Sequence, residues 1–83
     1  MNVSVEVSMY PLKEDFIADI QAFIKSLKQH EGIRVKTNSM STRVYGAYAD
    51  VFSILQSEIE KSAQQNKHVS FVMKLIPMDL DTD

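Results

Sequence analysis

Four segments of the sequence alternate between apolar and polar residues, and this pattern constrains the fold more than any other feature. In the first segment, residues 3–10, the apolar positions are Val3, Val5, Val7 and Met9. A period of two with β-branched residues predicts a strand with one buried face, which ends at Pro11 because proline cannot donate to the ladder. The pattern recurs at residues 33–38, 41–48 and 68–76. The polar residues 38–41 have the length of a hairpin connection between the middle two segments.

Two longer segments carry apolar residues at helical spacing. Residues 13–29 place an apolar stripe at i, i+4, i+7 and i+11, formed by Phe16, Ile20, Phe23 and Leu27. Gly32 is the expected stop of this helix. The second helix is expected over residues 50–65, with Asp50 as its N-cap. Its stripe consists of Val51 or Phe52, Leu55, Ile59 and Ala63.

The order of these elements, β-α-β-β-α-β, predicts the fold. In a chain of 83 residues it indicates one α+β domain, a ferredoxin-like two-layer sandwich with a four-stranded antiparallel sheet. The usual strand order of this topology, numbered along the chain, is 4-1-3-2. We assign the domain to residues 1–77. Residues 78–83, with three aspartates, are expected to form a loose acidic C-terminal tail.

The charge and composition exclude several classes of function. Nine basic and eleven acidic side chains, three of the latter in the tail, give no general attraction to nucleic acid, so no nucleic-acid partner is expected. The absence of cysteine excludes disulfides, thiolate metal sites and thiol nucleophiles. No apolar run has membrane-spanning length and no signal-peptide pattern occurs, so we expect a cytoplasmic protein without a membrane partner.

The sequence contains no constellation for catalysis or metal binding. His30 and His68 lie far apart without carboxylates at metal spacing, and no glycine-rich phosphate loop or nucleophile motif occurs. We therefore expect no catalytic residue, no metal, no cofactor and no enzymatic activity. Arg34, Lys36 and Arg43 lie in a stretch without acids. They are either solvated strand positions or a local anion site.

The sheet face away from the helices is expected to mix small hydroxyls, bases, tyrosines and aliphatic residues. Glu6 is its single acid. It either forms a cross-strand ion pair with Lys74 or Arg43, or accepts hydrogen bonds from an amino-heterocycle. Partial burial by a partner subunit, rather than exposure in a monomer, is favoured by Tyr10, Tyr45, Val72 and Ile76.

Three segments are informative together: VSMYPL at residues 7–12, TNSMSTRVYG at residues 37–46 and VSFVMK at residues 69–74. They resemble the thiamine/hydroxymethylpyrimidine-binding family, also called the YkoF-like group, and the resemblance extends from Val3 to about Ile76. It implies a ferredoxin-like domain, used in pairs or fours, that binds thiamine or its pyrimidine moiety without an established reaction. The family pattern falls on Tyr10, Pro11, Thr37, Asn38, Met40, Ser41, Thr42 and Gly46. Tyr45 and Ala47 stand where many relatives carry acids, which leaves the identity of the ligand open.

The resemblance therefore predicts a small-molecule-binding protein that is a homodimer or homotetramer. Its ligand is thiamine or the pyrimidine moiety, held at or near a subunit interface because a chain of 83 residues has little room to enclose a deep pocket. The expected ligand-binding residues are Glu6, Ser8, Tyr10, Asn38, Met40, Ser41, Thr42 and Tyr45. Their hydroxyl, amide and carboxylate groups match an aminopyrimidine edge, and tyrosine or methionine covers the flat ring. The alternative is a ligand-free regulatory or structural homo-oligomeric interaction domain.

Overall fold

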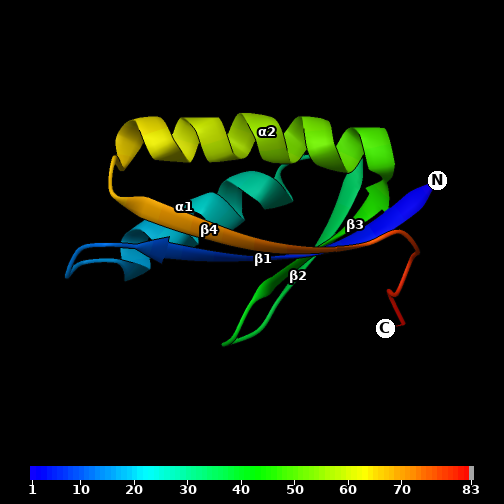
Figure 1. Cartoon of the computed structure of the whole chain (residues 1–83), viewed down its shortest axis with the longest axis horizontal. Coiled ribbons are helices and arrows are strands. Elements are labelled where there is room, and N and C mark those ends of the chain that lie inside the picture. Colours follow the sequence, from blue (N-terminus) through cyan, green and yellow to red (C-terminus); the bar gives the residue numbers. More distant parts are fainter. Residues whose placement is uncertain (83) are drawn as a thin grey trace.

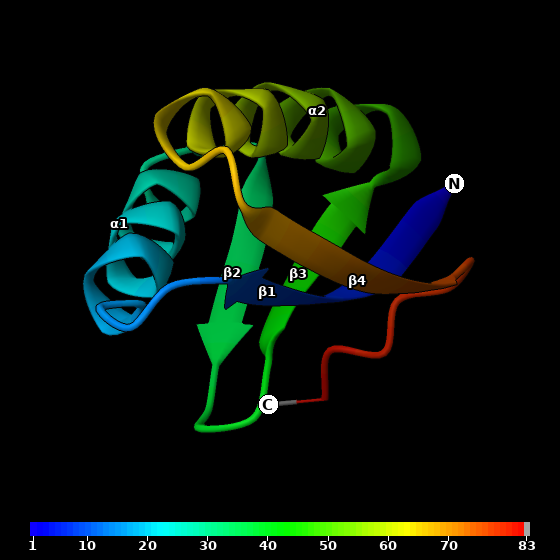
Figure 2. The same cartoon turned by 60° about the vertical axis from the view of Figure 1, so that its left-hand side comes forward.

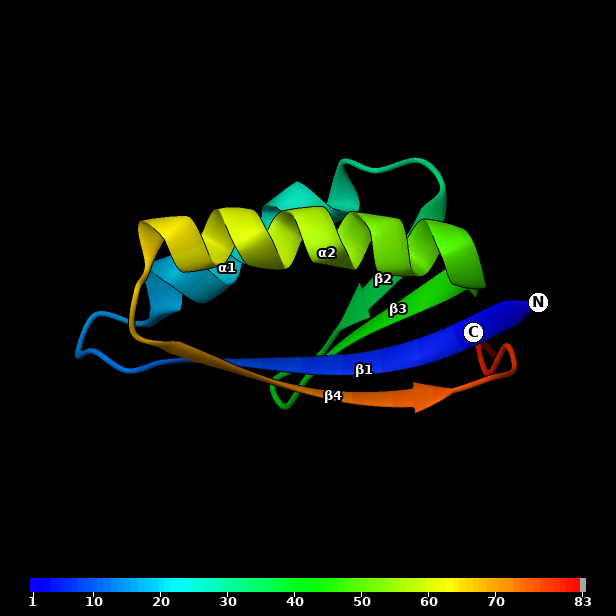
Figure 3. The same ribbon diagram turned by 45° about the horizontal axis from the view of Figure 1, so that its top comes forward.

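Two helices cover one face of a four-stranded sheet and form a second layer (Figures 1 and 3). The computed structural model describes residues 1–82, with the elements β1 Asn2–Pro11, α1 Ile17–Lys28, β2 Ile33–Thr37, β3 Thr42–Ala47, α2 Tyr48–Gln65 and β4 Val69–Ile76. The sheet order is β2-β3-β1-β4, and every neighbouring pair is antiparallel. These observations confirm the predicted ferredoxin-like α+β sandwich and its strand order.

The alternation along β1 sorts its side chains between the two faces of the sheet. Val5 lies opposite Val44 of β3, and the next residue, Glu6, lies opposite Arg43. The face toward the helices forms the core, whose buried members are Val3, Val5, Val7, Met9, Phe23, Leu27, Ile33, Val44, Val51 and Leu55. Burying one aliphatic or aromatic side chain of this kind contributes about 1.5–3 kcal/mol, so this cluster is the main source of stability.

Helix α1 is shorter than predicted at both ends. It begins at Ile17 rather than at residue 13, and its N-cap residue Phe16 makes no side-chain capping bond. Phe16 and Ile17 are 44% and 58% exposed, so the predicted apolar stripe contacts the sheet only from Ile20 onward. Without that burial, the preceding turn has too little stabilisation to be helical. The helix ends at Lys28, and Gly32 directly precedes β2 instead of stopping the helix.

Helix α2 begins earlier than predicted, because it follows β3 without a loop. Its first residue is Tyr48, so Asp50 lies in the first turn and is not the N-cap. The Tyr48 amide donates to the Met1 carbonyl at 2.8 Å, which satisfies one of the free amides at the helix start. In the described chain, neither helix combines the length and the apolarity needed to cross a membrane.

A buried carboxylate joins the two helices. The predicted stripe of α2 contained Ile59, but the structure buries Glu58 more completely, between α2 and the end of α1. Glu58 Oε1 lies 3.1 Å from His30 Nε2, and Glu58 Oε2 lies 3.4 Å from Lys61 Nζ. Burial alone would raise the pKa of Glu58, but hydrogen bonds from Ser26 and His30 and the nearby Lys61 outweigh it and lower the pKa.

The C-terminal residues correct the prediction of a loose tail. After β4 the chain turns back, and residues 78–81 lie on the sheet face opposite the helices (Figure 2). Ser4 Oγ donates to the Met78 carbonyl at 2.8 Å and accepts the Leu80 amide at 2.8 Å. Composition could not reveal this docking, because it depends on one hydroxyl of β1 at the other end of the chain. Asp83, the last residue of the predicted tail, lies outside the described residues.

Candidate functional site

A hollow of about 450 Å³ opens where β1, the start of α1 and the β2–β3 hairpin meet. We call it the hairpin hollow. Six of the eight predicted site residues line it: Ser8, Tyr10, Asn38, Met40, Ser41 and Thr42. The volume falls within the range of roughly 300–1,000 Å³ that is usual for small-molecule sites. The fold therefore places most of the predicted residues around one cavity of suitable size.

One wall of the hairpin hollow is the overhanging end of β1. The ladder between β1 and β3 ends at the pair Val7 and Thr42, whereas β4 pairs with β1 as far as Pro11. Beyond Val7, no strand within residues 1–82 pairs with β1 on the hairpin side. The backbone amides and carbonyls of this short stretch are thus hydrogen-bonding groups that a bound molecule can use. The sequence did not predict this wall, because the number of β1 residues that pair with β3 depends on where β3 begins.

The opposite wall is apolar and comes from α1. It consists of Phe16, Ile20, Phe23 and Ile24. The sequence predicted these residues as parts of a core stripe, and Phe23 is indeed buried in the core. Phe16, however, is exposed beside the loop before α1, where its ring is free to cover a flat ligand. The spacing of the apolar residues could not predict that Phe16 is exposed, because that depends on where α1 begins.

Asn38 shapes the hairpin that forms the third side. Its Oδ1 accepts the Met40 amide at 2.8 Å and the Ser41 amide at 2.9 Å, and its own amide donates to the Ser41 carbonyl at 3.1 Å. This is an Asx turn, in which the side-chain carbonyl replaces a backbone acceptor. The Asn38 side-chain NH₂ is the part left for a ligand. Met40 is 84% exposed at the tip of the hairpin, where it can fold over the hollow.

Ser41 and Thr42 present their hydroxyls on opposite faces of the sheet. Thr42 is buried on the helix side, opposite Val7. Ser41 Oγ donates to Glu6 Oε2 at 3.1 Å on the open side. The end of β3 is therefore polar on both faces, and Ser41 links the hairpin hollow to the open face of the sheet.

Glu6 and Tyr45, the other two predicted residues, lie outside the hairpin hollow. They line a smaller hollow of about 240 Å³ on the open face, together with Arg43, Lys74 and Leu80. Glu6 Oε1 lies 3.5 Å from Lys74 Nζ, so the expected cross-strand ion pair is present. Both side chains are well exposed, and such a pair contributes about 0.2–1 kcal/mol. Tyr45 is only 5% exposed, because the C-terminal segment lies over it.

No metal site accompanies these hollows in the part of the chain that the structure describes. Within residues 1–82, no group of three or more histidines, aspartates or glutamates is close enough to hold a metal ion. The hairpin hollow itself is lined by hydroxyls, one amide side chain, backbone groups and apolar side chains. This set can bind a neutral polar ring by hydrogen bonds and stacking.

The fold and the hairpin hollow define a ferredoxin-like domain with a cavity between its hairpin and its first helix. The chain belongs to the YkoF-related family, whose model matches residues 2–76. This match confirms the resemblance seen in the three sequence segments.

Solved structures of other proteins share this fold. A protein from Streptococcus pneumoniae has a TM-score of 0.86 and 21% identity, covering 99% of this chain and 92% of that chain. A Thermotoga maritima protein provisionally assigned to thiamine biosynthesis or salvage has a TM-score of 0.85 and 15% identity, covering 98% and 92%. A domain of unknown function from Bacillus cereus has a TM-score of 0.76 and 17% identity, covering 98% and 85%. No curated protein matches the chain.

Proposed function

We propose that the chain binds a small organic molecule of the thiamine class in the hairpin hollow. The observation that carries this proposal is the composition of that hollow, which has one apolar wall from α1 and one polar wall from the hairpin and the end of β1. Membership of the YkoF-related family supports it, as does the similarity to a protein provisionally assigned to thiamine biosynthesis or salvage. The proposed role is binding, without a chemical step.

The pyrimidine moiety matches the hairpin hollow better than the charged thiazolium ring of thiamine does. An aminopyrimidine offers an NH₂ donor and ring-nitrogen acceptors. The Asn38 NH₂ and the β1 amides can donate to the ring nitrogens, and the Ser41 oxygen, whose proton goes to Glu6, can accept from the NH₂. Phe16 and Met40 cover its flat face. No carboxylate lines the hollow among the described residues, so nothing there neutralises a cation. We therefore propose that the ligand is held through its pyrimidine ring.

A second copy of the chain is proposed to complete the site. Met40 and Tyr10 at the rim are both largely exposed, so one copy leaves the hairpin hollow open. β4 is an edge strand of the sheet, and its exposed side chains include Val72 (57%), Met73 (49%) and Leu75 (44%). An apolar edge strand favours pairing with another chain. A homodimer or homotetramer covers this edge and provides the missing wall.

The second candidate function is a ligand-free interaction domain. The apolar β4 edge favours this function equally well, because self-association needs no ligand. The two functions differ in what the hairpin hollow does. It binds a small molecule in the first and stays empty in the second.

Isothermal titration with hydroxymethylpyrimidine and with thiamine distinguishes the two functions. We expect heat from both compounds, with hydroxymethylpyrimidine bound at least as tightly as thiamine because the hollow has no carboxylate. Ser41→Ala removes one hydrogen-bonding group and should weaken binding by about two- to tenfold.

The matched control for this titration is Ser57→Ala. Ser57 is exposed on α2 and lies outside the hairpin hollow, so its substitution should leave the affinity unchanged. If neither compound gives heat at millimolar concentration, small-molecule binding of this class is excluded and the interaction domain remains. Equal weakening by the two substitutions contradicts the proposed location.

A further inference from the structure

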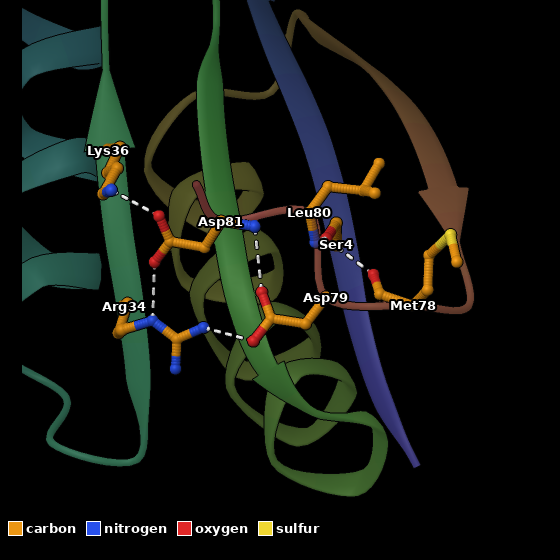
Figure 4. A network of polar contacts seen from close by, with 7 residues as sticks. All are labelled: Ser4, Arg34, Lys36, Met78, Asp79, Leu80 and Asp81. Atoms are coloured by element: carbon orange, nitrogen blue, oxygen red, sulfur yellow. Dashed lines mark hydrogen bonds and ion pairs between the residues drawn. The ribbon is translucent and has the colours of Figure 1, made fainter. Parts of the chain in front are cut away.

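The C-terminal segment forms a bound peptide on the open face of the sheet. The chain reverses tightly at Pro77, where the Met78 amide donates to the Ile76 carbonyl at 2.8 Å. The next residues cross β1 and β3 (Figure 4), and the Asp81 amide donates to Asp79 Oδ1 at 2.9 Å, which makes a turn. Ser4 is 8% exposed, and its hydroxyl bonds the backbone of this segment on both sides of Asp79. Ser4 therefore binds the segment through its backbone, whatever side chains the segment carries.

Two aspartates of the segment are held by bases of β2. Arg34 Nη2 donates to Asp79 Oδ2 at 2.8 Å, and Arg34 Nε donates to Asp81 Oδ2 at 2.8 Å. Lys36 Nζ also donates to Asp81. Hydrogen bonds from Lys36 and Arg34 lower the pKa of Asp81 from its ordinary 3.8 to about 2. One guanidinium thus binds two carboxylates that lie two residues apart in the sequence.

Leu80, the residue between the two aspartates, lies near the ring of Tyr45. Leu80 lies over the small hollow that Tyr45 and Ile76 also line. Arg34 lies above the Tyr45 ring, with 5.9 Å between the guanidinium carbon and the ring centroid. We call this surface the tail site; it is formed by Ser4, Arg34, Lys36 and Tyr45. It binds the backbone of the segment, two carboxylates and one apolar side chain.

The tail site also contains a hydrogen-bond donor, on Arg43, that the described part of the chain's own tail does not use. Arg43 lines the same small hollow, and its buried Nε has no hydrogen-bond partner among residues 1–82. Glu6, its neighbour in register, is bonded by Ser41 and Lys74 instead. An unpartnered guanidinium nitrogen at the edge of the site offers a place for a further acceptor.

The contacts of the docked segment differ in their exposure. The side chains of the Arg34–Asp79 ion pair are 52% and 36% exposed, and such pairs are weak and sensitive to salt, whereas the Asp81 side chain is only 9% exposed. Leu80 is also still 44% exposed over the small hollow. When the segment leaves, Tyr45 and three bases become accessible on one face.

We propose that the tail site binds an acidic segment of a partner protein, with carboxylates two residues apart, and that the chain's own tail competes for it. The site is self-occupied in the isolated chain, so a partner must displace Asp79 and Asp81 to bind. This site is separate from the hairpin hollow, and the proposal does not depend on the small-molecule function.

The test compares the full chain with a full-length double variant, Asp79→Asn with Asp81→Asn, which weakens the internal competitor. Each is titrated with the free peptide MDLDT while the backbone amide signals of Ser4 and Tyr45 are followed by NMR. We expect saturable shifts in the double variant, roughly tenfold weaker binding to the wild type because its site is mostly occupied, and weaker binding at high salt.

Two controls make the result specific. The neutral peptide MNLNT should bind the double variant far more weakly than MDLDT does. Adding Arg34→Gln to the double variant should abolish the shifts while circular dichroism shows an unchanged fold. Equal affinity of the wild type and the double variant, or equal affinity of the two peptides, overturns the proposal. A wild-type dimer that becomes a monomer on substitution of the two aspartates also overturns it, because the tail then occupies a second copy.

Discussion

At the scale of single residues, Gly46 shows how closely two layers approach. A Cβ at this position would lie 3.2 Å from the Gly32 carbonyl oxygen and 3.4 Å from a methyl carbon of Ile33 and of Val51. These neighbours are backbone and packed core side chains, which cannot move far. The close approach of these neighbours is a physical reason for the glycine that the family pattern places here.

Gly46→Ala should therefore destabilise the protein by about 1–3 kcal/mol, because the added methyl group overpacks the junction of β3 and α2. Urea unfolding measures the loss. Gly32→Ala is the matched control, since a Cβ there would lie 3.8 Å from its nearest neighbour, Asp50 Oδ2. The control should stay within about 0.5 kcal/mol of the wild type. Similar losses in both variants would show that the contact at Gly46 is not the cause.

Single residues also show the limit of prediction from sequence. Asn38 was predicted as a ligand-binding residue at the hairpin connection, and the structure shows that it also forms the turn through its bonds to Met40 and Ser41. Its contact with a ligand stays a prediction. Tyr45 was placed on the correct face, and a partner subunit was expected to bury it. The structure buries it within one chain instead, beside Leu80 of the docked C-terminal segment, which lies 35 residues later in the sequence.

At the scale of elements, the strands could be predicted and the helix ends could not. A strand is recognised from local alternation, and the register of β1, β3 and β4 confirms the predicted faces. Helix ends depend on which turns contact the sheet, as the late start of α1 shows. The hairpin hollow exists partly because of this late start, which leaves Phe16 beside the end of β1.

The contact between the two helices depends on the buried Glu58 carboxylate. Glu58→Gln should destabilise the protein by about 1–3 kcal/mol at neutral pH, because it weakens the charged hydrogen bonds of a buried group. The pKa of Glu58 is lowered from 4.5, so its contribution is fully present above that value and is lost as the pH falls through the lowered pKa. Urea unfolding at several pH values should therefore show that the difference in the free energy of unfolding between the wild type and Glu58→Gln becomes smaller at acidic pH.

The control for this prediction is Glu60→Gln on the same helix. Glu60 is exposed, so its substitution should change stability by no more than about 0.5 kcal/mol at any pH. A pH-independent difference between Glu58→Gln and the wild type would mean that packing, rather than the ionised carboxylate, joins the helices.

At the scale of the whole molecule, three parts of the sandwich have different roles. One sheet face and both helices enclose the core, the open face holds the tail, and the β4 edge is left apolar and exposed. The hairpin hollow lies at one end of the sandwich and is open on its outer side. This open side agrees with the proposal that a second copy of the chain closes the site.

We propose that a pyrimidine ligand occupies the hairpin hollow, and this claim can be tested by an NMR titration of the ¹⁵N-labelled protein with hydroxymethylpyrimidine. We expect saturable amide shifts at residues 8–12, at the first turn of α1 and at residues 38–42, with little change at Ser4, Arg34 or Tyr45. Saturable shifts that centre on Tyr45 and the tail instead, or no saturable shifts at millimolar ligand, would contradict the claim.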